Sequence, residues 1–243
     1  MFMYGMYGYG YGYGFDPTII LVLIGVALSL WAQGRVNSTF SRYSRVRSMT
    51  GMTGAEAARR LLNAQGIYDV TVQLIAGELT DHYDPRTKTV NLSQSVYGAT
   101  SVAAIGVAAH ECGHAMQDNE GYAPLRFRSA LVPAANFGSK LSWPLILLGL
   151  VFGGLGSPLV EIGILMFSLA VLFQLVTLPV EYNASARAVK LLDSQGILAG
   201  EEVSGTRKVL NAAALTYVAA AATSILQLLR LIILFGGRNR RDN

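Results

Sequence analysis

Two histidines and a glutamate with metal-binding spacing stand near the middle of the chain, in His110-Glu111-Cys112-Gly113-His114. Histidines four residues apart on a helix project from one face, so both imidazoles can bind one metal ion. Glu111 lies one residue beyond the first histidine, where it can take a proton from a metal-activated water without binding the metal. The pattern predicts one Zn²⁺ per chain, held by His110 and His114, with Glu111 as general base.

The same five-residue pattern also occurs on surface helices whose two histidines do not bind a metal. Here the chain has only three histidines, and two of them are in this motif. Cys112 is two residues from each histidine and therefore points to the opposite helix face, where we expect it to pack in the core.

A catalytic zinc needs a third protein ligand. The metzincin extension would require glycine at position 117 and histidine at position 120, and this chain has Gln117 and Glu120, so that subclass is excluded. Glu120 is a candidate ligand, and Glu181, which follows a long apolar run, is its rival. The residues alone leave both open.

Composition indicates a membrane protein. Of 243 residues, 52% are hydrophobic and only 14% are charged, against roughly 25% in ordinary soluble domains. The single cysteine excludes an intrachain disulfide. Although the net charge is +4, the positive residues are unevenly placed along a chain rich in apolar runs, so we expect lipid and no nucleic acid as its partner.

Apolar runs predict three or four membrane spans. The Gly156-Ser157-Pro158 turn joins two of them into a helical hairpin. Because nothing basic precedes the first run, we expect a retained anchor. The last run is interrupted by Gln227 and Arg230, and whether it crosses fully is open. The runs are 17–32, 141–155, 162–180 and 212–235.

Basic residues orient the chain. Eleven Lys and Arg lie between the first and second runs, whereas the segment before the first run and the hairpin tip contain none. We therefore expect a multi-pass protein of the bacterial cell membrane whose catalytic domain faces the cytoplasm.

The segment between these runs has the signals of a folded α+β unit. Thr53-Gly54-Ala55-Glu56 is a capping box that predicts a helix start. Strands are expected at 70–75, 79–83 and 88–92, and a helix at 98–117. The predicted fold is zincin-like, a small antiparallel sheet plus an active-site helix, joined to a helical membrane domain; residues 87–92 are a candidate edge for a bound peptide.

The domain boundaries follow from these patterns. They are a disordered Tyr/Gly-rich tail (1–16), an anchor (17–32), a cytoplasmic zincin-like domain (33–140), the hairpin (141–180), a second part of the catalytic domain (181–211), a membrane-embedded helix (212–235) and a basic tail (236–243).

Further stretches accompany the histidine motif: Trp31-Ala32-Gln33, Gly51-Met52-Thr53-Gly54, Glu181-Tyr182-Asn183-Ala184-Ser185 and Ala214-Leu215-Thr216-Tyr217-Val218. Together they resemble the YugP-like bacterial membrane zinc metallopeptidases, and more distantly the HtpX-type and prenyl-protein-processing membrane proteases. The resemblance implies that Glu181 is the third zinc ligand. Relatives carry an aspartate four residues later that supports a ligand histidine. This chain has Ser185 there, so Ser185 or Asn183 would supply that hydrogen bond.

The resulting hypothesis is a gluzincin-type endopeptidase that hydrolyses peptide bonds of membrane-associated proteins by zinc-activated water. Candidate donors to the oxyanion are His82, Tyr217 and Arg187. Two alternatives belong to other classes, namely a noncatalytic membrane scaffold with a structural zinc site and a transporter whose pathway is marked by Gln227 and Arg230. The substrate, any oligomer and any regulatory membrane partner cannot be inferred from the sequence.

Overall fold

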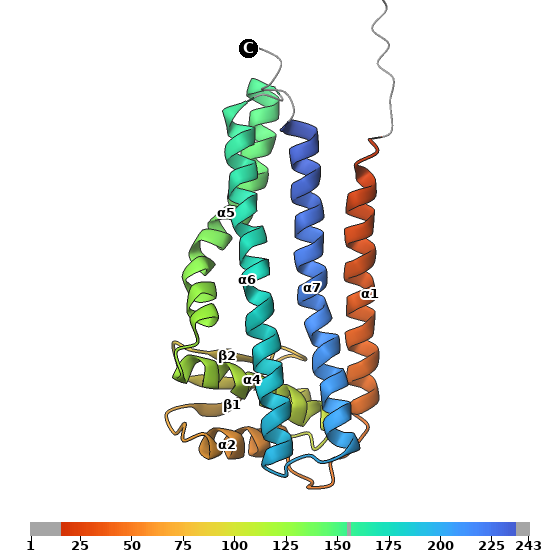
Figure 1. Ribbon diagram of the computed structural model, residues 1–243, viewed down its shortest axis with the longest axis vertical. Coiled ribbons are helices and arrows are strands. Elements are labelled where there is room, and N and C mark those ends of the chain that lie inside the picture. Colours follow the sequence, from red (N-terminus) through yellow and green to blue (C-terminus); the bar gives the residue numbers. More distant parts are fainter. Residues whose placement is uncertain (1–15, 155–156, 237–243) are drawn as a thin grey trace, which may run out of the picture.

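Long helices dominate the computed structural model, which describes residues 16–154 and 157–236. Within these ranges four helices stand side by side, and the small sheet and shorter helices gather at one end of them (Figure 1). Each of the four is long and apolar enough to cross a membrane. They are α1 (Ile19–Tyr43), α5 (Ala123–Gly153), α6 (Pro158–Ser194) and α7 (Glu201–Phe235).

Four expected runs thus correspond to the four long helices, but each helix is longer than its apolar run. At about 1.5 Å per residue, α6 is long enough to cross the bilayer and continue beyond it. It passes the expected boundary at residue 180 without a break. Residues 1–15 of the expected Tyr/Gly tail and residues 237–243 of the basic tail lie outside the described residues.

The shorter elements form the other part of the molecule. α2 begins at Thr53, whose hydroxyl accepts from the backbone of Glu56 while the Glu56 carboxylate accepts from the Thr53 backbone, so the predicted capping box is confirmed. These elements are α2 (Gly54–Ala64), β1 (Thr71–Ile75), β2 (His82–Asp84), β3 (Thr89–Ser93), α3 (Gln94–Tyr97) and α4 (Val102–Asn119).

The sheet is mixed, so the expectation of an antiparallel sheet is wrong. Its order is β1-β3-β2, with β1 parallel and β2 antiparallel to β3. β3 is buried at every position and therefore takes the centre, paired on both sides. Residues 76–88, which include β2, provide the long crossover that a parallel pair requires. Since β3 is central, the expected peptide-binding edge at residues 87–92 is also wrong, and β1 and β2 form the two edges.

Helices α5 and α6 form the predicted antiparallel hairpin (Figure 1). Their contacts pair residues early in α5 with residues late in α6, and the reverse. A Cβ added at Gly138 would lie 2.3 Å from the Met166 carbonyl oxygen, and one at Gly163 would lie 2.6 Å from an Ile146 side-chain carbon. Small residues at these positions let the helix backbones approach closely, as is common between membrane helices.

Helix α7 packs against α1 along the other side of the bundle. The Thr223 hydroxyl donates to the Gly25 carbonyl at 3.1 Å. Near the far end from the sheet, Arg230 pairs with Asp16 at 3.0 Å and donates to the Thr18 hydroxyl. This ion pair neutralises the charge that interrupts the last apolar run.

Helix α4 is the core of the sheet-containing end. Fourteen of its residues are buried, among them Cys112, whose side chain is fully inaccessible. Burial raises the pKa of the Cys112 thiol, which donates to the Ala58 carbonyl of α2. The cysteine therefore packs α4 against α2, on the side of α4 away from its histidines.

The closest approach of α4 to α6 is at Gly113. A Cβ at this position would lie 2.6 Å from the carbonyl oxygen of Ala184 and 3.0 Å from its Cα. Only glycine allows the two backbones to meet at this distance, because the obstacle is main chain and cannot rotate away.

Gly113→Ala should therefore destabilise the protein by about 1–3 kcal/mol, the cost of overpacking a closely packed contact. Gly34→Ala is the matched control, since an added Cβ there meets nothing within 4 Å and alanine favours a helix. Thermal unfolding in detergent should give a lower midpoint for the first variant and an unchanged or higher one for the second. Equal midpoints for Gly113→Ala and wild type would contradict this account of the helix contact.

Candidate metal centre

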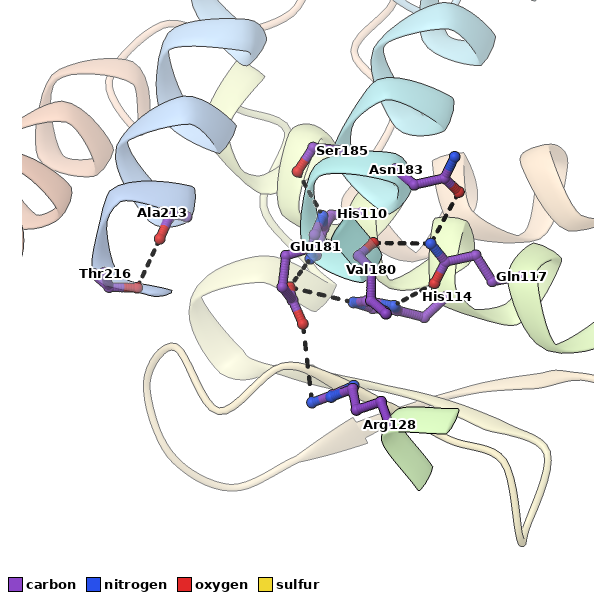
Figure 2. Close-up of polar contacts among 10 residues, drawn as sticks. All are labelled: His110, His114, Gln117, Arg128, Val180, Glu181, Asn183, Ser185, Ala213 and Thr216. Atoms are coloured by element: carbon purple, nitrogen blue, oxygen red, sulfur yellow. Dashed lines mark hydrogen bonds and ion pairs between the residues drawn. The ribbon is translucent and has the colours of Figure 1, made fainter. Parts of the chain in front are cut away.

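Three potential metal ligands from two helices converge at the α4–α6 contact (Figure 2). Glu181 Oε2 lies 3.2 Å from His110 Nε2 and 3.6 Å from His114 Nε2. Their ligand atoms all lie within 4.8 Å of one another, and the imidazole rings meet edge to face. One metal ion could therefore contact all three residues.

Local helix geometry explains this convergence. His110 and His114 are one turn apart on α4, so they share a face. On α6, Glu181 is one turn before Ala184, the residue that touches Gly113. The backbone contact at Gly113 therefore places Glu181 directly over the two imidazoles.

Ser185 contacts Nδ1 of His110, the ring nitrogen that does not face Glu181. Its hydroxyl lies 3.1 Å from His110 Nδ1, while Nε2 of the same ring faces Glu181. For Nε2 to offer its lone pair to a metal, Nδ1 must carry the proton, and the Ser185 oxygen can accept it. A hydrogen bond of this kind orients ligand histidines in metal sites.

Gln117 performs the same task for His114. Its Nε2 donates to the Val180 carbonyl at 2.8 Å and to Asn183 Oδ1 at 3.0 Å. A carbonyl can only accept, so the amide orientation is fixed and Gln117 Oε1 is left to accept from His114 Nδ1 at 3.0 Å. The contact leaves the lone pair of His114 Nε2 facing Glu181.

Arg187 ends the series of hydrogen bonds that begins at His114 and runs through Gln117 and Asn183. Its Nε donates to Asn183 Oδ1 at 2.7 Å, and its Nη1 lies 2.7 Å from Glu120 Oε1. Glu120 is exposed and holds this arginine at the end of α4, away from the histidines. Of the two expected supports of a ligand histidine, Ser185 contacts His110 directly, whereas Asn183 reaches His114 only through Gln117.

Glu111 faces the site from α4. It lines a cavity of about 320 Å³ together with His110, His114 and Glu181, and a second cavity of about 190 Å³ with His110 and Glu181. Glu111 is 7% exposed, and within the described residues its carboxylate acts on His114 through its charge, without a direct hydrogen bond. A carboxylate in this position is available to a small molecule that enters either cavity.

Tyr217 of α7 lines both of these cavities, as does Glu181. His82 of β2 lines only the larger one. His82 Nδ1 donates to the Thr80 carbonyl, and its Nε2 accepts from the Asn91 amide. Both nitrogens of His82 are therefore engaged, whereas Tyr217 lines both cavities.

Arg128 is a residue of the site that sequence analysis missed. Its Nη2 lies 3.9 Å from Glu181 Oε1, the carboxylate oxygen that faces away from the histidines (Figure 2). The guanidinium also lies over the Phe173 ring, and its buried Nε has no partner within the described residues. No spacing in the sequence signals this role, because it depends on α5 passing beside α6.

The donor set fits zinc. Two imidazole nitrogens and one carboxylate oxygen are ligands that zinc accepts in catalytic sites, whereas calcium and magnesium prefer oxygen alone. Burial lowers the pKa of His114, but its hydrogen bond to Glu181 and the charges of Glu111 and Glu181 outweigh this, so its net pKa is raised. The raised pKa indicates that the carboxylates of Glu111 and Glu181 stabilise a positive charge at the His114 ring.

Comparison with known proteins agrees with this chemistry. Residues 18–236 match the model of a family described as "Putative neutral zinc metallopeptidase". The chain is 49% identical over 224 residues to a protein of Bacillus subtilis (strain 168) named "Putative membrane protease YugP", a match that covers 92% of this chain and 98% of the relative. No solved structure matches the chain significantly.

Replacing Gln117 by methionine should weaken zinc binding about 10–100-fold, the usual effect of removing the partner of a ligand histidine. Gln117→Met keeps the length of the side chain and loses both the acceptor for His114 and the two donors. The exposed Gln65→Met is the control, and zinc competition with a fluorescent chelator is the measurement. Equal affinities in the two variants, with both folded, would show that Gln117 does not orient His114.

Proposed function

This chain belongs to the neutral zinc metallopeptidase family, as its resemblance to the YugP-like proteins predicted, and from that premise we propose that it is a gluzincin-type endopeptidase. One observation carries the proposal. Two imidazoles and the Glu181 carboxylate converge within 4.8 Å, and the unpaired carboxylate of Glu111 lines the same cavity. This combination provides both a metal site and a base beside it.

His110, His114 and Glu181 would hold the zinc ion. When bound, zinc supplies Lewis acidity, which polarises a peptide carbonyl and lowers the pKa of a water molecule to about 7. The three residues use one ligand atom each, so a fourth position stays open, as catalytic sites require. Within the described residues no fourth His, Cys, Asp or Glu joins the group, which favours catalysis over a structural site.

Glu111 would act as general base and then as general acid. Its carboxylate takes a proton from the attacking water and passes it to the nitrogen of the departing amine. Proton transfer of this kind typically contributes about 10²–10⁴-fold to the rate. The absence of a competing partner for Glu111 within residues 16–154 and 157–236 keeps the carboxylate available for both steps.

Tyr217 is the residue we assign to the developing oxyanion. Tyr217 lines both cavities together with His110, Glu111 and Glu181, so its hydroxyl could donate to an oxygen beside the metal ligands. Arg128 adds positive charge behind Glu181 and holds the carboxylate in place. Arg187 is bonded to Glu120 and Asn183 and lines neither cavity, so we give it a structural role.

Substrates would be protein segments near the membrane. β2 is an edge strand, and its residues His82 and Tyr83 line the larger cavity beside Glu111. An extended peptide could pair with this edge and pass the metal site. Because eleven basic residues lie in the segment 33–140, the sheet-containing end would face the cytoplasm.

Glu111→Gln should keep zinc and lose about 10²–10⁴-fold in cleavage, because the amide cannot accept the proton. Metal analysis and hydrolysis of casein in detergent measure the two properties separately. The control is Glu78→Gln, an exposed change in the loop before β2. Near-normal turnover by Glu111→Gln would remove this base from the mechanism.

The third ligand is tested by a matched pair of glutamates. Glu181→Ala should lose zinc and activity, because its carboxylate is the one next to both imidazoles. Glu120→Ala should keep both properties, because this exposed carboxylate holds only Arg187. If the two variants exchanged these results, Glu120 would be the ligand.

Orientation is tested by cysteine labelling of intact cells with a membrane-impermeant maleimide. Leu159→Cys, at the tip of the hairpin, should react from outside, and Tyr68→Cys, beside the sheet, should react only after lysis. Both sites are exposed, and the native Cys112 is fully buried, so background labelling should be low. Labelling of Tyr68→Cys in intact cells would reverse the proposed orientation.

A further inference from the structure

A groove between α1, α6 and α7 lies apart from the metal centre. It has a volume of about 680 Å³, within the range of small-molecule sites. None of the three proposed zinc ligands, nor Glu111, lines it. Its polar lining includes Arg35, Ser38 and Arg42 of α1, Lys208 and Asn211 of α7, and Tyr182 of α6.

The groove is positively charged, and no acidic side chain in its lining offsets that charge. Arg35 and Arg42 are seven residues apart on α1 and share a face, and Lys208 contributes from α7. No Asp or Glu lines the groove. Within the described residues these three cations make no ion pair or hydrogen bond, and Arg42 contacts only the ring of Tyr43. Three unpaired cations around one hollow favour an anion of more than one charge-bearing oxygen, such as a phosphate group.

The groove lies where the apolar parts of the helices end. On α1 the apolar run ends at Ala32, three residues before Arg35. On α7 it begins at Ala212, four residues after Lys208. Tyr182 follows the end of the apolar run on α6 and is 47% exposed. Cations and a tyrosine at this level are typical of the layer of lipid headgroups.

Apolar side chains continue from the charged part of the groove toward the bundle. Trp31 is one turn from Arg35 on the same face of α1 and is 54% exposed. On α7, Leu215 lines the groove and Val218 is exposed one turn further along. A ligand that fits both parts has an anionic head and an apolar tail.

We propose that this groove binds the phosphate headgroup of an anionic phospholipid, with the acyl chains lying along Trp31, Leu215 and Val218. Basic pockets between membrane helices on the cytoplasmic side are suited to such headgroups. The opposite face of α7 carries Val209, Ala213 and Tyr217 into a cavity beside the metal centre. A lipid in the groove therefore holds α1 and α7 together behind the wall of that cavity, whether or not zinc is present.

The test uses the full chain purified in a neutral detergent, with phosphatidylglycerol added in mixed micelles. Thermal stabilisation as a function of lipid gives an apparent affinity. Arg42→Gln/Lys208→Gln removes two groove cations, and Arg45→Gln/Arg207→Gln removes two exposed cations next to them that do not line the groove. A cation beside an anionic headgroup strengthens binding about fivefold, so losing two cations that line the groove should weaken binding about 30-fold. The control should bind nearly normally, because its two cations do not line the groove.

Two further probes identify the ligand. Phosphatidylcholine should stabilise wild type much less, because its headgroup has no net charge. Inorganic phosphate should also be weak, because it lacks the apolar tail. Lys208→Arg keeps a positive charge at position 208 and should retain the affinity for phosphatidylglycerol. This result would show that the glutamine variant binds more weakly because it lost charge and not because it misfolded.

Three results would overturn the proposal. Equal losses in the groove and control variants would mean that only general surface charge attracts the lipid. Equal stabilisation by phosphatidylcholine would remove the requirement for an anion. Equal stabilisation by inorganic phosphate, lost in the groove variant, would make this a site for free phosphate and not for lipid.

Discussion

The backbone contact between Gly113 of α4 and Ala184 of α6 positions everything else in the candidate site. Because the two main chains meet there, Glu181 lies one turn to one side, over both imidazoles, and Ser185 lies beside His110. Asn183, in the same turn of α6, contacts Gln117. A single crossing of two helices therefore brings together the proposed third ligand and the hydrogen bonds to both histidines.

The same crossing links the metal centre to the membrane. α6 is one continuous helix from the hairpin tip at Pro158 to Ser194, so the residues that complete the site are carried by a helix long enough to span the bilayer. Buried charged groups are costly unless they are paired. Here Glu181 is buried, with Arg128 facing one carboxylate oxygen and the two imidazoles facing the other. The guanidinium offsets part of the carboxylate charge, and a cation would be attracted to the side where Oε2 meets the imidazole nitrogens.

Local patterns in the sequence predicted the parts of this structure that depend on local geometry. The spacing of His110 and His114 requires only a helix, the capping box at Thr53 requires only its own four residues, and the apolar runs follow from composition. The choice of Glu181 required the family resemblance, because the residues alone left Glu120 open as a candidate ligand.

Features that depend on packing could not be found this way. Alternation of polar and apolar residues reveals neither the central position of β3 nor its parallel pairing with β1. Gln117 was considered only as the residue that excludes a metzincin, although its amide holds His114. Arg128 and Tyr217 reach the site only because α5 and α7 pass beside α4 and α6.

Zinc K-edge X-ray absorption of the purified protein tests the central claim most directly, because it reports the atoms bound to the metal. We predict two imidazole nitrogens at about 2.0–2.1 Å, oxygen ligands at a similar distance and no sulfur. Because Glu181→Ala should lose zinc, the same preparation of that variant should show little zinc absorption. A sulfur atom at about 2.3 Å, which only Cys112 or a methionine could supply, or a single imidazole, would contradict the proposed site.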